Sequence, residues 1–80
     1  MKNNPDKITS KLLDHFSEAR KQQGLSHEKL ANLAGIHRST ISLLESKKII
    51  PTISTCLKIS EALGISLGEV LVVLEKNNKK

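Results

Sequence analysis

The sequence predicts an all-α domain built from five short helices, and three observations carry this prediction. Apolar residues recur at three- and four-residue spacing along most of the chain, which is the period of a helix with one buried face. The helical segments are separated by residues that end helices, namely Gly24, Gly35, Pro51 and Gly64. The chain has 80 residues, of which 38% are hydrophobic, so it can form one small hydrophobic core.

The chain begins with a polar segment, residues 1–6, which we expect to form a flexible arm. From Lys7 onward the pattern becomes helical, because apolar side chains fall on one face of a helix. The residues on that face are Ile8, Leu12, Phe16 and Ala19. Gly24 can adopt the left-handed conformation that ends many helices, so we expect the first helix to stop there.

A second, shorter helix is expected after Ser26. The Ser26 hydroxyl can accept a hydrogen bond from an otherwise unpaired backbone N–H of the first turn, and Glu28 suits the positive end of the helix dipole. Gly35 ends this helix. Its expected inner face consists of Leu30, Ala31 and Ala34.

The third helix is expected from His37 to Ser46, with Ile41 and Leu44 pointing inward at a spacing of three residues. Residues 47–51 form a loop, because Pro51 disfavours a helical conformation at the residue before it. A fourth helix then starts near Ser54, a candidate cap, and ends at Gly64. Its apolar residues are Cys56, Leu57, Ile59 and Leu63.

The fifth helix is expected from Leu67 to about Lys76. It opens with the capping-box pattern, in which the Ser66 and Glu69 side chains each satisfy a backbone N–H of the other residue. Residues 77–80 are polar and are expected to fray. The predicted domain therefore spans residues 7–76.

The composition favours a nucleic-acid partner and argues against several other classes of protein. The formal charge is +5 and the isoelectric point is about 9.6, which suits a protein that binds a polyanion. In the alternative, the positive charge only keeps a small protein soluble. Aromatic residues make up 1% of the chain, too few for the stacking surfaces that bind single-stranded nucleic acids. No apolar run is long enough to span a bilayer, and the start of the chain lacks an apolar signal core.

The chemistry-bearing residues do not form a pattern of catalysis or of cofactor binding. Cys56 is the only cysteine and the three histidines are scattered, so we expect no disulfide, no metal site and no cofactor. Cys56 is read as a small core residue, with a redox sensor as the alternative. His15 is expected on the surface. Because no nucleophile–base pair or glycine-rich phosphate loop is present, we predict that the chain is not an enzyme.

The turn at Gly35 and Ile36 is the feature that carries a function. A short turn with a glycine lets two helices cross steeply, and Ile36 is expected to anchor the turn in the core. The third helix then presents a compact polar face that fits a DNA major groove, and Lys47 and Lys48 follow it. That face consists of Arg38, Ser39, Thr40 and Ser42. Many helical hairpins of this kind do not bind DNA, so the turn alone would be weak support for a DNA-binding function.

Residues 25–36, followed by Ser39-Thr40-Ile41-Ser42 and Leu44-Glu45, resemble the helix-turn-helix of the lambda repressor and Cro-type (Xre-like) family of transcriptional regulators. Pro51 and residues 57–64 resemble the fourth helix of that family. The resemblance covers about residues 12–71 and implies a compact five-helix lambda-repressor-like fold. The length and the apolar last helix resemble the controller proteins of restriction–modification systems most.

The resemblance implies a role for each matching residue. The third helix would be the recognition helix, with Arg38, Ser39, Thr40 and Ser42 facing bases or phosphates. Ser26 and His27 would lie on the DNA backbone, where the N–H groups at the start of a helix favour phosphate. His37 would contact phosphate or only cap the helix. Arg20 and Glu45 occupy the positions of an ion pair that joins the first and third helices in the family.

This sequence departs from the family pattern at three expected DNA contacts. His27 stands where the family usually has Gln, and it would donate to phosphate better when protonated. Lys47 stands where the family usually has Gly, and it adds a positive charge. Leu43 stands where the family often has a polar contact; it could touch a thymine methyl or be an exposed leucine without a role.

The fifth helix is apolar nearly all round, which is more than a helix at the surface of a monomer needs. The face that covers the core consists of Leu67, Val70, Leu71 and Leu74, whereas Val72 and Val73 are surplus. We therefore expect a homodimer, with two recognition helices about 34 Å apart on a palindromic operator. The expected interface consists of Val70, Val72, Val73 and Leu74. In the alternative, Val72 or Val73 packs against the N-terminal arm.

Taken together, the sequence predicts a homodimeric regulator that binds double-stranded DNA in the cytoplasm, at the nucleoid. It would act by occupying its site, either blocking RNA polymerase or contacting it from a neighbouring position. The competing prediction is a protein-interaction module of the antitoxin type, in which the third helix need not read bases.

Overall fold

The structure is a computed structural model, and it describes residues 5–78. As predicted, the described residues are all-α, with five helices and no strand. The helices are α1 (Pro5–Gln22), α2 (His27–Ala34), α3 (Arg38–Glu45), α4 (Ile53–Leu63) and α5 (Leu67–Asn78). None of them has the combination of length and hydropathy that crossing a membrane requires.

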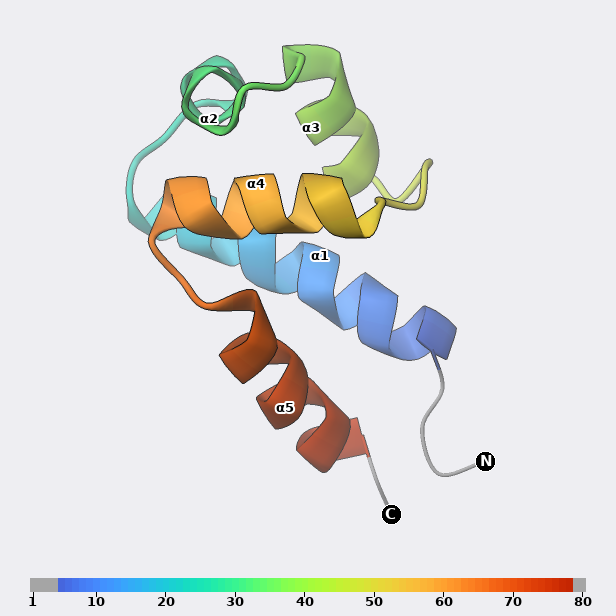
Figure 1. Cartoon of the computed structure of the whole chain (residues 1–80). Coiled ribbons are helices and arrows are strands. Elements are labelled where there is room, and N and C mark those ends of the chain that lie inside the picture. Colours follow the sequence, from blue (N-terminus) through green and yellow to red (C-terminus); the bar gives the residue numbers. More distant parts are fainter. Residues whose placement is uncertain (1–4, 79–80) are drawn as a thin grey trace.

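Two crossing helices, α1 and α4, form the centre of the domain (Figure 1). The pair formed by α2 and α3 lies on one side of them, and α5 lies on the opposite side. Helix α2 packs on both α3 and α4, whereas α5 packs mainly on α1. The recognition helix predicted from the sequence is therefore held at one end of the molecule, away from the helix that was predicted to form the dimer.

The core is assembled from one face of every helix, as the apolar spacing predicted. All five inward positions predicted for the second and third helices are buried. These are Leu30, Ala31, Ala34, Ile41 and Leu44. Leu13 is also buried, although it stands outside the face predicted for the first helix. Of the four apolar residues predicted for the fourth helix, Leu57 is exposed on α4. The other three are buried, namely Cys56, Ile59 and Leu63.

The turn between α2 and α3 depends on a glycine. Gly35 has a φ of 73°, in the left-handed region, and its N–H bonds to the carbonyl of Ala31. The N–H of Ile36 bonds to the same carbonyl at 3.0 Å, and the Ile36 side chain packs against the core. These two hydrogen bonds to one carbonyl end α2 at Ala34 and let α3 start at Arg38, four residues later.

The predicted cap of α2 is present, but the cap of α4 is a different residue from the one predicted. Ser26 accepts a hydrogen bond from the N–H of Lys29 at 3.0 Å. In α4 the capping residue is Thr52, whose hydroxyl accepts from the N–H of Thr55 at 3.1 Å, and Ser54 is already inside the helix. The prediction of Ser54 was wrong because Thr52, directly after Pro51, can take the extended conformation that a cap needs.

Both terminal helices are longer than predicted. Helix α1 includes Pro5 and Asp6, which were expected in the arm; proline fits the first position of a helix and Asp6 suits the dipole there. The rest of that segment, residues 1–4, lies outside the described residues. Helix α5 continues to Asn78, two residues beyond its expected end at Lys76, and Lys76 lies at the favourable negative end of the helix. Residues 79–80 lie outside the described part.

Candidate nucleic-acid interface

A groove of about 540 Å³ separates the start of α2 from the outward face of α3. Six of the ten predicted DNA-binding residues line it, although the two helices contribute them from separate stretches of chain. The residues that line the groove are Ser26, His27, Glu28, Arg38, Ser39, Ser42 and Leu43. The fold thus brings most of the predicted site to one continuous surface.

Burial on the inner faces of the two helices orients the groove residues. Ile41 and Leu44 are each 2% exposed, which fixes the rotation of α3 about its axis. Because 3.6 residues make one turn, Arg38, Ser39 and Ser42 are then directed outward, and all three are exposed. The polar face that the sequence predicted is therefore available to a ligand.

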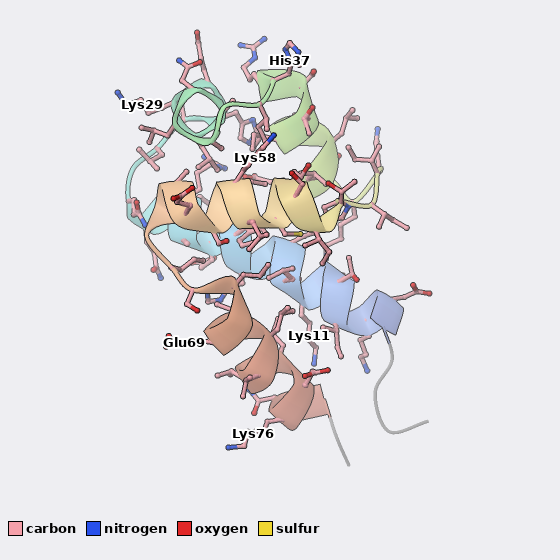
Figure 2. All side chains as sticks on the ribbon, viewed as in Figure 1. Lys11, Lys29, His37, Lys58, Glu69 and Lys76 are labelled. Carbon is pink, nitrogen blue, oxygen red and sulfur yellow. The ribbon has the colours of Figure 1, made fainter. Side chains whose placement is uncertain are left out.

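The other four predicted contacts lie outside the groove. His37 is the capping residue of α3, makes no capping bond through its side chain, and stands at the outer end of the helix (Figure 2). Thr40 is half-buried. Lys48 is exposed directly after α3, whereas the Nζ of Lys47 lies 2.9 Å from Asp14 Oδ1 on α1.

Lys47 has the backbone conformation of a glycine. Its φ is 63°, and it is the one non-glycine residue with a positive φ among the described residues. The N–H groups of Lys47 and Lys48 bond to the carbonyls of Leu44 and Leu43 at 3.0 and 2.9 Å, so this residue ends α3 as Gly35 ends α2. The left-handed conformation explains why the related family usually has Gly at this position.

The ion pair implied by the family resemblance is present and includes a third residue. Arg20 Nε donates to Glu45 Oε2 at 2.7 Å, and Arg20 Nη2 donates to Glu45 Oε1 at 3.0 Å. The other terminal nitrogen of Arg20 donates to the carbonyl of Leu25 at 2.7 Å. His27 Nε2 lies 3.1 Å from Glu45 Oε1, so the start of α2 is tied to the end of α3.

The environment of Glu45 favours its ionised form. Burial by itself raises the pKa of this carboxyl, but hydrogen bonds and positive charge from Arg20 and His27 outweigh burial and hold the pKa below its ordinary value. Ser17 adds a hydrogen bond to Oε1 at 3.2 Å. Glu45 is therefore an anionic centre that joins α1, α2 and α3, and it contacts the groove residue His27.

Glu28 is the groove residue that the sequence did not predict. Its position in the first turn of α2 predicted only a favourable interaction with the helix dipole. The approach of α3 places it on the same groove as Arg38. No local pattern reveals such a neighbour, because the two residues meet only when the two helices pack.

The family model described as helix-turn-helix matches residues 16–70, which include α2, α3 and α4 completely. This range contains the groove and the Arg20–Glu45 pair. The chain belongs to the helix-turn-helix family of Xre and lambda-repressor type. The family consists of DNA-binding transcriptional regulators, and its helix-turn-helix corresponds to α2 and α3 of this chain.

Several regulators of this family are similar to the chain. It is 45% identical over 61 residues to the HTH-type transcriptional regulator PuuR of Escherichia coli, a match that covers 76% of this chain and 33% of PuuR. It is 35% identical over 63 residues to an uncharacterized HTH-type transcriptional regulator of Methanothermobacter thermautotrophicus, covering 79% and 91% of the two chains. The regulator YgzD of Bacillus subtilis is 32% identical over 60 residues, covering 75% and 91%.

The chain thus spans about a third of the length of PuuR but corresponds to nearly the whole of the two shorter regulators. No solved structure gives a significant match.

Proposed function

We propose that this helix-turn-helix regulator binds a palindromic DNA operator as a homodimer and reads it with the groove between α2 and α3. The observation that carries this proposal is the gathering of six predicted contact residues on that groove. Arg38 is long enough to reach a guanine edge, and the short side chains of Ser39 and Ser42 let α3 lie deep in the major groove. The N–H groups at the start of α2 face a phosphate.

Three groove residues have defined parts in this proposal. His27 Nε2 donates to Glu45, so the other ring nitrogen can donate to a phosphate only when the ring is protonated. Leu43 lines the groove beside Ser42, which supports contact with a thymine methyl over an exposed leucine without a role. Glu28 repels phosphate and would restrict the register in which the backbone passes α2.

Outside the groove, Lys48 is the exposed cation that meets the DNA backbone. Lys47 would reach it only after releasing Asp14. Such a regulator acts by occupying its operator, where it blocks RNA polymerase or touches it from an adjacent site, in the compartment that holds the DNA.

The dimer interface we propose is the outward side of α5. Val72 and Val73 are exposed, while Val70 and Leu74 are half-buried against the core and continue the apolar surface inward. Two copies joined through α5 form an isologous pair, which matches a palindromic operator. Sedimentation of the Val72→Ser/Val73→Ser variant tests this interface; a monomeric variant supports it, and a wild-type chain that is monomeric at micromolar concentration refutes it.

The reading of DNA is tested by selecting bound sites from random duplexes and then measuring affinity for the selected site and for unrelated DNA. Arg38→Ala is expected to lose about 1–3 kcal/mol of binding to the selected site only, because it removes a base contact. Lys48→Ala is expected to weaken both kinds of binding and to lower the salt slope by about 1, because it removes a phosphate contact.

Lys29→Ala provides the matched control, since Lys29 extends from α2 away from α3 (Figure 2) and does not line the groove. If neither Arg38→Ala nor Lys48→Ala changes affinity, the DNA-reading role fails and a protein partner takes its place as the main ligand.

A further inference from the structure

His27 lies between a buried carboxylate and a surface that is open to a ligand. Its Nε2 is 3.1 Å from Glu45 Oε1, and the ring lines the groove between α2 and α3 with 36% of the side chain exposed. Among residues 5–78, the contact with Glu45 is the one hydrogen bond that the ring makes. One ring nitrogen is therefore in use, and Nδ1 has no partner within this part of the chain.

The charge of Glu45 decides which nitrogen of the His27 ring carries a hydrogen. Arg20 donates two hydrogen bonds to the Glu45 carboxylate, whose pKa lies below its ordinary value, so the carboxylate is ionised at neutral pH. An ionised carboxylate only accepts hydrogen bonds, so Nε2 is the donor in this contact. In a neutral ring, Nδ1 is then an acceptor without a hydrogen, and only a protonated ring donates from both nitrogens.

The start of α2 is the place where the proposed function puts a DNA phosphate. The N–H groups of His27 and Glu28 precede the first helical hydrogen bond of α2. That bond joins the N–H of Leu30 to the carbonyl of Ser26 at 3.0 Å. A phosphate bound to the two preceding N–H groups lies close to the His27 ring, which belongs to the same turn. Because a phosphate oxygen only accepts hydrogen bonds, a bare Nδ1 repels it and a protonated Nδ1 binds it.

Charged groups of both signs lie on the helices around His27. They are Glu28 on α2, Arg38 and Glu45 on α3, Arg20 on α1, and Lys58 on α4, whose side chain extends toward α2 and α3 (Figure 2). All of these charges are present with and without DNA, and Arg20 is already paired with Glu45. The charge that changes on binding is the phosphate, and a negative charge near an imidazole favours its protonated form.

We propose that this regulator takes up a proton at His27 when it binds DNA, so that its affinity for DNA rises as the pH falls. The proposal rests on the proposed function, because DNA supplies the phosphate. The protonated ring donates from Nε2 to Glu45 and from Nδ1 to the phosphate, and thus bridges two anions. Binding and protonation are reciprocally linked: a complex that holds more protons than the free chain is strengthened by acid and weakened by base.

The expected pH range follows from the chemistry of the ring. An imidazole in water changes its charge at about pH 6.5, and the uptake of one proton alters affinity by at most about tenfold per pH unit. We therefore expect the affinity of wild type to rise by about three- to tenfold from about pH 8 to about pH 6. The Glu45 carboxyl stays ionised throughout, because its pKa lies below the ordinary value of 4.5.

The test measures the affinity of the full chain for its selected duplex across this pH range at constant ionic strength. His27→Gln is the decisive variant, because a glutamine amide donates a hydrogen bond without titrating. Its affinity is expected to change by less than about twofold over the range in which wild type gains about three- to tenfold. The same difference is expected on unrelated duplex DNA, since a phosphate contact carries no sequence information.

The other two histidines of the chain provide the controls. His15 is exposed on α1, and His15→Gln is expected to keep the full pH dependence. His37 stands at the outer end of α3 (Figure 2), where a DNA contact is also proposed, so His37→Gln separates the two rings. It is expected to keep the pH dependence whatever its affinity. Groups that all variants share, such as the α-amino group, cancel in these comparisons.

Calorimetry gives a second readout that does not depend on a comparison of affinities. DNA binding measured in two buffers of different ionisation enthalpy counts the protons taken up. At about pH 7.5 we expect wild type to take up between about 0.3 and 1 proton per chain, and His27→Gln to take up close to none.

Failure of this proposal is distinct from failure of DNA reading. If Arg38→Ala and Lys48→Ala weaken binding as expected but wild-type affinity does not depend on pH, only the proton link is overturned. It is also overturned if His27→Gln keeps the pH dependence, or if His37→Gln is the variant that loses it. A chain that binds no DNA at any pH overturns both proposals.

Discussion

Two ion pairs join α1 to the helix-turn-helix, and they differ in burial. Arg20 and Glu45 have side chains that are 12% and 15% exposed, and they share several hydrogen bonds with their neighbours. Lys47 and Asp14 are 40% and 64% exposed and meet through a contact of 2.9 Å. Both pairs hold the end of α3 to α1, but water competes with only one of them.

The contribution of an ion pair to the stability of the fold therefore depends on how deeply its charges are buried. The buried pair cannot lose one partner without leaving the other charge poorly solvated, so the structure depends on it. The exposed pair can be broken at little cost, and Lys47 can then turn toward DNA. We expect the first pair to set the position of α3 and the second to be exchangeable.

The largest effect is expected at Glu45. Glu45→Gln should lower the free energy of unfolding by about 2–3 kcal/mol, because the Arg20 guanidinium keeps its burial but loses its anionic partner. Urea denaturation at neutral pH measures this, with Glu18→Gln on the exposed side of α1 as the control. A loss as small as that of the control would show that the buried pair is no stronger than an exposed one.

The second effect is a loss of stability in acid that depends on Glu45. Its pKa is lowered in the folded state, so its contribution is present above the unfolded value of about 4.5 and disappears as the pH falls through the folded value. Unfolding measured from about pH 6 to about pH 3 should show wild type and Glu45→Gln converging in stability. A difference that stays constant over this range would contradict the assigned role of the carboxylate.

The third effect concerns the backbone of the exposed pair. Lys47→Gly should be more stable than Lys47→Ala by about 1 kcal/mol, because both lose the ion pair but only glycine adopts a φ of 63° without strain. Comparing the thermal unfolding of the two variants separates the effect of the backbone conformation from the effect of losing the ion pair. Equal stability would indicate that the left-handed conformation at this position costs nothing.

The smallest effect is expected at Asp14. Asp14→Ala should change the free energy of unfolding by less than about 0.5 kcal/mol, since the pair is exposed and screened by salt. Asp14→Ala should raise the affinity for DNA, and by more than it changes stability, because it frees Lys47 and removes a negative charge. Affinity for unrelated duplex DNA at two salt concentrations measures this; an unchanged affinity would indicate that Lys47 does not reach the backbone.

The local features of the fold were predictable from the sequence. Gly35 and Gly64 end helices as predicted, Ser26 caps α2, and the residues expected inside α2 and α3 are buried. These features depend on residues within one or two helical turns, where spacing and side-chain chemistry are decisive. The errors were local too: Thr52 replaced Ser54 as a cap because neighbouring hydroxyl residues compete for one role.

The ion pair of Arg20 and Glu45 was predictable for another reason, since the resemblance to a family supplied it. Its third member was not. His27 departs from the family pattern and was expected on phosphate, yet Nε2 bonds to a carboxylate 18 positions away in the sequence. The proposed DNA contacts and the α5 interface remain predictions that the experiments above test.

By itself, the sequence determined five helices, their polar and apolar faces, the turn at Gly35 and membership in a family of DNA-binding regulators. Only the tertiary structure decided which charges meet. It joined His27 to Glu45 and Lys47 to Asp14, brought Glu28 to the groove and left Ile53 and Leu57 of α4 exposed. The physical reason is that helix formation depends on neighbours along the chain, whereas these contacts arise when helix faces pack and residues far apart in sequence come within a few ångströms.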